Sequence, residues 1–450
     1  MTQIFVASTL FGAVTVAAAI DAGRFGPPGR RRMLLVSDNT AIPELGRDLT
    51  ESPGFAGIRD RFDEVLSWND EISPLHPSGW MPRTEELMIW ERLFRDRWGL
   101  GGEPLELAVE TIAASPARAL TSIFSEAAIT VYADGLMSYG PTRDGLPDGV
   151  GSRITRLLHP DLVPGLVPLL LCEHGVASET IPDDAFSAVL HKLNRPGPPA
   201  DGLEGAALVV GQYLAALEIL SEQEEDELHV AMLRGVVARG HTTVLFKPHP
   251  SSPVRTTDQL AHEAARLGAR LLVLDAAVPA ETWCSALRPS LIVGCFSTAL
   301  VTASRYHGVP AATVGTGLLL QRLSPYQNSN RVPVTIIDAT LPHLAEDGTL
   351  STPFLSRTSD LHRLLVAVAY AMRAASLPER RGEAAAFLSE HASSEPMARY
   401  FKKRRLTALG LPGGLSPAKR GLLAAALPPR SRRRRIAARA FDAAGLDRDR

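Results

Sequence analysis

The tetrapeptide Lys247-Pro248-His249-Pro250 places an ammonium group and an imidazole at a forced turn of the chain. The apolar run 242–246 before it is typical of a buried strand. Because proline has a fixed φ and no N–H, the strand cannot continue through this segment. A histidine just beyond a strand can donate a proton or a hydrogen bond to an anionic leaving group. A structural turn with an exposed histidine has the same pattern, so both interpretations stay open.

A second candidate segment holds Ser297 and Thr298, between an apolar run and a helical pattern. Hydroxyls and free N–H groups at the start of a helix bind phosphate well. An ordinary helix N-cap uses the same residue types. The segment therefore predicts either a phosphate contact or a simple cap.

A third candidate is Asp134, which precedes Gly135 and follows the apolar run 129–133. A carboxylate at a strand end could accept the proton of an attacking hydroxyl. Asp-Gly is also a common turn dipeptide. Taken alone, this segment favours a turn over a general base.

Short apolar runs alternate with helical patterns along most of the chain. In the first half we predict strands at 4–7, 33–37, 64–67, 105–110, 129–133 and 167–172, and helices at 12–22, 84–98 and 115–126. In the second half we predict strands at 207–210, 243–246, 270–274, 290–293 and 311–314, and helices at 222–239, 257–267, 280–287 and 298–306. Strands that alternate with helices form parallel, doubly wound sheets. The sequence therefore predicts an α/β protein.

A Pro/Gly-rich stretch divides the alternating pattern into two halves. We expect an N-terminal domain at 1–195, a linker at 196–204, a second domain at 205–355, a helical return segment at 356–400 and a basic tail at 401–450. Two Rossmann-like domains that face each other leave a cleft in which two substrates can meet. The predicted fold is therefore two such domains with a helical, basic C-terminal tail.

Charge is distributed unevenly along the 450 residues. The last fifty residues carry 14 Lys and Arg against 3 Asp, whereas the whole chain has a net charge of −2. A basic tail can be a solvated end, or it can contact an anionic membrane. The acidic body argues against a nucleic-acid partner. We therefore expect a cytoplasmic protein, with the tail as a candidate contact for the inner face of the plasma membrane.

Cysteine and the N-terminus give further expectations. The three cysteines are far apart in sequence, so neither a disulfide framework nor a metal-binding spacing is predicted. The apolar N-terminus, 1–20, lacks the basic residues that precede a signal peptide's apolar region, and it fits a strand, a turn and a helix. No run of about 18 residues lacks a polar interruption, so we expect no transmembrane helix.

The motifs follow one another in a recognisable order: strand and acid-Gly, linker, strand and Gly211-Gln212, strand and Lys-Pro-His-Pro, then a strand and Ser-Thr before a helix. This order resembles the bacterial α-2,8-polysialyltransferase family over about residues 1–330. Members of that family are metal-independent glycosyltransferases of the GT-B architecture. Their motifs are acid-acid-Gly in the first domain, then His-Pro and Ser-Ser/Thr in the second.

The resemblance implies a role for each motif. Asp134 would be the general base, and His249 would contact the donor phosphate and assist the departure of CMP. Lys247 and Pro250 would belong to the nucleotide site. The partners would be a CMP-linked sialic-acid donor and a glycan acceptor in capsule-type polysaccharide synthesis, with no cofactor.

The remaining nucleotide contacts are implied in the same way. Ser297 and Thr298 would bind the phosphate, and Glu281 would contact the ribose. Gly211 would allow the backbone to approach the nucleotide closely. Glu281 also suits the first turn of a helix, where the dipole favours an acid. No His, Asp and Glu cluster has the spacing of a metal site.

One departure from the family pattern concerns the base. The chain has Ala133 where the family has the first acid, so Asp134 stands alone before the glycine. Three alternatives therefore stay open: a CDP-linked polyol-phosphate transferase of the teichoic-acid type, a sugar-nucleotide 2-epimerase, and a degenerate protein that binds glycan or nucleotide without turnover.

Overall fold

The computed structural model describes residues 1–40, 42–43, 48–193, 203, 205–249 and 254–415. Its N-terminal part is a seven-stranded parallel sheet in the order β3-β2-β1-β4-β5-β6-β7. The strands are β1 (Thr2–Ala7), β2 (Arg31–Val36), β3 (Glu64–Ser67), β4 (Leu105–Val109), β5 (Ala128–Tyr132), β6 (Ile154–Pro160) and β7 (Ser178–Ile181). The helices are α1 (Leu10–Asp21), α2 (Trp68–Ile72), α3 (Leu87–Arg97), α4 (Ala117–Ile123) and α5 (Asp183–Lys192).

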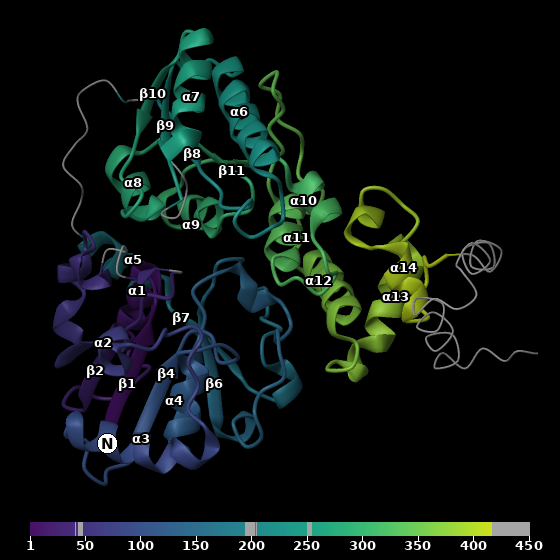
Figure 1. Cartoon of the computed structure of the whole chain (residues 1–450). Helices are drawn as coiled ribbons and strands as arrows, with labels where there is room; N and C mark the ends of the chain where they lie inside the picture. The colour runs from purple at the N-terminus through teal and green to yellow at the C-terminus, as the bar shows by residue number, and fades with distance from the viewer. Residues whose placement is uncertain (41, 44–47, 194–202, 204, 250–253, 416–450) are drawn as a thin grey trace, which may run out of the picture.

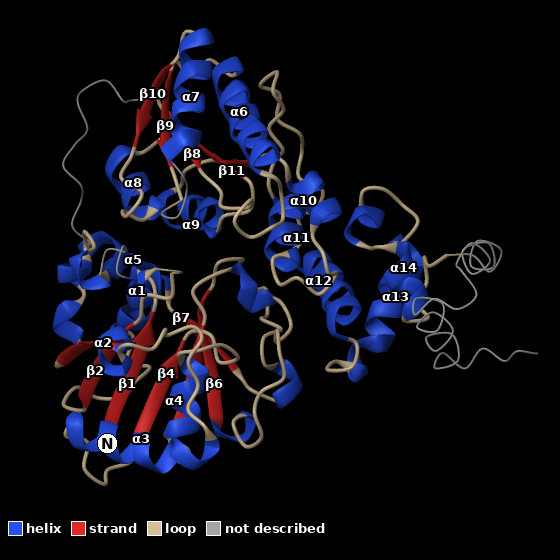
Figure 2. Cartoon of the chain, viewed as in Figure 1, coloured by secondary structure: helices blue, strands red, loops and turns tan. Residues whose placement is uncertain are grey.

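The second part repeats this design in a five-stranded parallel sheet of order β10-β9-β8-β11-β12. Its strands are β8 (Ala207–Val210), β9 (Thr243–Lys247), β10 (Arg270–Val273), β11 (Leu291–Gly294) and β12 (Ala311–Thr313). Its helices are α6 (Glu222–Ala238), α7 (Val254–Arg266), α8 (Ala280–Leu287) and α9 (Thr298–His307). Both sheets thus have the strand order of a Rossmann-like fold, and Figure 2 shows them as two separate α/β bodies. The predicted fold class is confirmed.

The C-terminal part that the structure describes is mainly helical, with α10 (Thr316–Arg322), α11 (Arg331–Thr340), α12 (Thr358–Arg373), α13 (Arg381–His391) and α14 (Lys403–Ala408). They lie along one side of the molecule and reach from the second domain toward the first (Figure 1). The Thr358 hydroxyl donates to the Pro164 carbonyl at 3.1 Å, and Arg373 lies 3.3 Å from Asp144. The return segment therefore touches both domains. Most of the predicted basic tail, 416–450, lies outside the described residues.

The N-terminal apolar stretch forms β1 and α1, as predicted. All six β1 residues are buried, and Thr9 caps α1 by accepting from the Gly12 N–H at 2.9 Å. Ten of the twelve α1 residues are buried between the sheet and neighbours such as α5. An apolar helix of this kind is a core element, because a helix that is apolar on all sides must be covered on all sides.

The predicted strand at 167–172 is wrong. That segment is irregular, with Leu171 at a positive φ of 63° and Pro168 without a donor. The actual strands nearby are β6, which contains the charged Arg156, and the short polar edge strand β7. An apolar run signals burial, and here the burial is in a loop rather than in a sheet.

That loop belongs to a shared core. Five buried side chains of the first domain pack in the hydrophobic cluster of the second domain and the C-terminal helices; they are Leu136, Tyr139, Leu162, Leu166 and Leu169. Arg305 of α9 also forms ion pairs with Asp161 and Asp183, and the Tyr306 hydroxyl donates to Asp183 at 3.2 Å. The two domains are therefore in contact well beyond the linker, most of which (196–202 and 204) lies outside the described residues.

A buried carboxylate joins the helices of the C-terminal part to one another. Asp338 of α11 is fully buried and accepts from the Thr316 hydroxyl at 2.6 Å and from the Tyr400 hydroxyl at 2.8 Å. We expect Tyr400→Phe to lower the free energy of unfolding by about 1–3 kcal/mol, because a buried acceptor loses its donor. Urea unfolding measures this change.

Tyr370→Phe is the matched control, because the hydroxyl of Tyr370 accepts from the exposed Arg381 at 3.1 Å. Solvent can replace that partner, so we expect a change below about 1 kcal/mol. Equal losses in Tyr400→Phe and Tyr370→Phe would contradict the importance assigned to the Asp338 contact.

Among the described residues, no helix is long and apolar enough to cross a bilayer.

Candidate active site

Strand order locates the candidate site. In a doubly wound sheet, ligands bind beyond the carboxyl ends of the strands, where the order reverses. The reversal lies between β1 and β4 in the first sheet and between β8 and β11 in the second. All the motifs of the sequence analysis except Glu281 directly follow a strand, and Glu281 opens α8.

The Lys-Pro-His turn follows β9. Lys247 is the last residue of the strand, is only 8% exposed, and donates to the carbonyls of Ala276 at 3.1 Å and Pro248 at 3.3 Å. The His249 ring stacks on Tyr213, with 4.7 Å between centroids and 9° between planes. Pro250 lies outside the described residues. The turn thus holds its imidazole by stacking against the segment that follows β8.

Gly211 makes this turn possible. A Cβ on Gly211 would lie 3.1 Å from the Pro248 Cα and 3.2 Å from the His249 nitrogen. The next residue, Gln212, donates its N–H to Nε2 of the buried His229 at 2.9 Å. The structural role of Gly211 is therefore to let the backbone after β8 approach the turn after β9.

Burial lowers the pKa of both basic groups in the turn after β9. Burial lowers the pKa of Lys247, and the charges of Glu281 and Asp275 oppose that effect. Burial and the nearby charge of Lys247 lower the pKa of His249 to about 4. The imidazole is therefore neutral near pH 7 in the free protein and can offer a hydrogen bond without carrying a charge.

The Ser-Thr motif begins helix α9. The Ser297 side chain is the N-cap and accepts from the Ala299 N–H at 3.3 Å, so the cap interpretation holds. Glu281, in the first turn of α8, is 7% exposed and accepts from the Thr302 hydroxyl at 2.6 Å. These contacts place a hydroxyl pair and a buried carboxylate beside the end of β11.

The first domain approaches this motif at the end of β5. A Cβ on Gly135 would lie only 3.2 Å from the Thr298 Oγ1. Asp134 keeps partial solvent access, yet the surrounding protein raises the pKa of its carboxyl; the charge of Glu281 adds to this effect, and a hydrogen bond from Thr9 opposes it. Asp134 therefore faces residues of the second domain across the cleft.

The structure brings most of the predicted site residues to one place. Gly135 approaches Thr298 across the domain interface, the charge of Glu281 acts on Asp134 and on Lys247, and Lys247 acts on His249. Ser297 and Gly211 lie at the ends of the two central strands of the second sheet. Their roles in binding and catalysis stay predictions.

The family model for alpha-2,8-polysialyltransferase (POLYST) matches residues 3–316, which include both sheets and all of these motifs. The chain belongs to this family. It is therefore a glycosyltransferase, as predicted, with two Rossmann-like domains in the GT-B architecture. No curated protein sequence shows a significant match.

Solved structures resemble this polysialyltransferase-family protein only distantly. The GT-B domain of a Photobacterium damselae sialyltransferase is 11% identical, with a TM-score of 0.41 and coverage of 75% of this chain and 96% of that one. Acinetobacter baumannii MurG is 12% identical, with a TM-score of 0.38 and coverage of 88% and 97%. A UDP-N-acetylglucosamine 2-epimerase is 11% identical, with a TM-score of 0.41 and coverage of 83% and 96%.

Sequence reasoning missed one residue of this polysialyltransferase-family site. Glu110 follows β4 directly, at the point where the strand order of the first sheet reverses. It accepts from the Ser8 N–H at 3.1 Å and from the Ser8 hydroxyl at 2.6 Å. The sequence does contain a signal, because an acid ends the predicted strand 105–110. The apolar pattern assigns that residue to the strand and not to the site.

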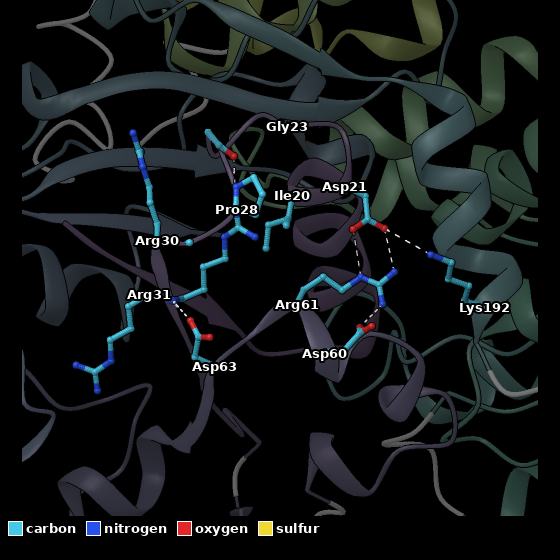
Figure 3. A pocket seen from close by; sticks show the side chains of 13 residues that line it. Ile20, Asp21, Gly23, Pro28, Arg30, Arg31, Asp60, Arg61, Asp63 and Lys192 are labelled. Atoms are coloured by element: carbon cyan, nitrogen blue, oxygen red, sulfur yellow. Dashed lines mark hydrogen bonds and ion pairs between the residues drawn. The ribbon is translucent and has the colours of Figure 1, made fainter.

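An open pocket of about 870 Å³ lies elsewhere on the first domain. It is lined by residues of the α1–β2 loop and of the segment before β3, with Arg61 paired to Asp21 at 2.9 Å and to Asp60 (Figure 3). Arg31 and Arg32 there begin β2, so the pocket is at the amino edge of the sheet. The candidate site is at the opposite, carboxyl edge.

Proposed function

We propose that this glycosyltransferase moves a sialic-acid-type sugar from a CMP-linked donor to a glycan hydroxyl, with inversion and without a metal ion. The observation that carries the proposal is the approach of Asp134 and Gly135 of the first domain to Thr298 and Glu281 of the second. It sets a candidate base of one domain opposite hydroxyl groups of the other, and a single displacement requires a base opposite groups that stabilise the leaving phosphate.

In the proposed reaction the acceptor O–H bond breaks and its proton moves to the Asp134 carboxylate. The acceptor oxygen forms a bond with the anomeric carbon, and the bond from that carbon to the phosphate oxygen breaks. The electron pair leaves with CMP. His249 donates a hydrogen bond to the departing phosphate, and Lys247 supplies positive charge nearby.

Several features of the second domain support a nucleotide site. The Ser297 and Thr298 hydroxyls stand at the start of α9, a ten-residue helix whose N-terminal N–H groups favour an anion. Glu281 is held by Thr302, so its carboxylate is oriented before a ribose arrives. Among the described residues, no group of three or more His, Cys, Asp or Glu could hold a metal ion. Metal independence is a separate part of the proposal and needs its own test.

A donor panel tests the proposal. The full-length protein is incubated with CMP-sialic acid, CDP-glycerol or a UDP-sugar, with an oligosialyl acceptor and with or without EDTA, and nucleotide release and product are measured. We expect CMP release and acceptor extension with CMP-sialic acid alone, unchanged by EDTA. Turnover of CDP-glycerol would overturn the proposed donor, and epimerisation of the UDP-sugar would overturn the proposed transfer reaction. Loss of activity with EDTA would overturn metal independence.

Calorimetry with CMP separates a weak enzyme from a binder. CMP binding without turnover of any donor would support a degenerate, non-catalytic protein. The cytoplasmic location, the tail's contact with an anionic membrane and the role in capsule-type polysaccharide synthesis are parts of the same proposal. Vesicle sedimentation with anionic and neutral lipid tests the membrane contact.

A further inference from the structure

Glu110 occupies the ligand-binding position of the first sheet. It follows β4, whose neighbours on the two sides are β1 and β5. Parallel strands end at the same edge, and the register pairs Val109 with Val131, three residues before Asp134. Glu110 and Asp134 are therefore the acids that follow two adjacent strands of one sheet.

The surroundings of Glu110 hold its carboxylate in place. Ser8 donates to both of its oxygens, and Ser8 itself joins β1 to α1. A Cβ on Gly12 would lie 2.0 Å from the Glu110 Oε1, so the helix carries a glycine where this carboxylate packs. Thr9, next to Ser8, lies near Asp134 and opposes the rise in the pKa of that carboxyl. One turn of chain thus positions both acids.

Glu110 also lines a cavity of about 130 Å³ together with Ser8, Asn39 and the segment 114–117. The side chain is partly accessible to solvent.

We propose that Glu110 supplies the second carboxylate of the acid pair, so that this chain carries on a neighbouring strand the acid that Ala133 does not provide beside Asp134. Glu110 acts as a positioning residue: its charge raises the basicity of Asp134, which takes the proton from the acceptor hydroxyl. The inference rests on the proposed function.

Electrostatics supports the pairing. Burial raises the pKa of Glu110 to about 7, the charge of Asp134 adds to this, and the hydrogen bonds from Ser8 oppose it. The other groups near the pair are the buried Tyr132 hydroxyl on β5 and Glu281 across the cleft. Below that pH the pair holds one proton, and above it both acids are charged. The charge of Glu110 then makes Asp134 a stronger base than it would be alone.

The pH dependence of kcat/KM tests this role. We expect an acid limb near pH 7 in the parent enzyme. In Glu110→Gln the limb moves to lower pH by about one unit or more, and the plateau falls by about tenfold or more, because Asp134 is then a weaker base. Glu110→Asp should keep the limb of the parent enzyme. Glu126→Gln, at the exposed amino end of β5, is the control and should leave both features unchanged.

Gly12→Ala provides a second variant that keeps the acid. The new methyl group displaces the Glu110 carboxylate, while alanine is the better helix former. Activity should therefore fall by about tenfold in the parent background and stay unchanged in the Glu110→Gln background. Equal losses in the two backgrounds, or an acid limb that does not move in Glu110→Gln, would overturn the inference.

A measurement without turnover separates this inference from the proposed function. Carboxyl ¹³C NMR, with Glu110→Gln to assign the resonance, follows the ionisation of Glu110 directly. Asp134→Asn should lower the pKa of Glu110, and an unchanged pKa would disprove the coupling. If no donor is turned over but the shift is seen, the proposed function fails while the acid pair stands.

Discussion

Asp134→Asn is expected to lower kcat for sugar transfer by about 10²- to 10⁴-fold, the usual contribution of a positioned general base. Asparagine has nearly the same shape and keeps an acceptor for the Thr9 hydrogen bond, so the loop after β5 should keep its conformation. The amide cannot take the acceptor proton. Single-turnover measurements with saturating donor and acceptor isolate this step.

Two controls make the Asp134 result interpretable. Asp148→Asn changes an exposed acid of the same domain and should leave kcat within about twofold. CMP affinity should stay unchanged in Asp134→Asn, because the base contacts the acceptor and not the nucleotide. Full activity in Asp134→Asn would exclude the residue as the base, whereas a loss of CMP affinity alone would assign it to the donor site.

His249→Ala is expected to lower kcat by about 10²- to 10³-fold, the range seen when one donor to a developing negative charge is removed. The free imidazole is neutral because burial and Lys247 lower its pKa to about 4. We therefore expect no alkaline limb near pH 6.5 in kcat/KM, since the group does not lose a charge there.

The control for His249 is His262→Ala, on the exposed face of α7 in the same domain, which should leave kcat unchanged. His249→Asn keeps a hydrogen-bond donor and should recover part of the lost rate. An alkaline limb near pH 6.5 that disappears in His249→Ala would contradict a neutral imidazole and indicate a charged one.

Local patterns predicted most of the fold. The strands 64–67 and 207–210 and the helix 280–287 have the predicted bounds, because each combines a clear periodicity with a turn or a cap beside it. The sequence does not predict strands β6 and β7, because neither has the apolar pattern of a buried strand. β6 contains Arg156 and ends in Pro160, and β7 is a short polar edge strand. Pairing makes both segments strands: β6 pairs with β5, and β7 pairs with β6.

The candidate site was predictable only where its residues form motifs. Asp134, His249 and Ser297 each stand in a short pattern that can be recognised without a structure. Glu110 has no such pattern, because its partners Ser8 and Asp134 are 102 and 24 positions away in the chain. Its place depends on strand order, and strand order depends on how the whole sheet assembles.

The leucines and the tyrosine of the first domain that pack into the second domain's core bear on engineering. A second domain cut at the linker would lose these side chains and leave an apolar hollow, while the first domain would expose Leu136 and Leu162 to water. A chimera that exchanges the second domain therefore has to match the side chains at these five positions to the core of the new domain. These side chains and the second domain form one hydrophobic core, so they have to be redesigned together.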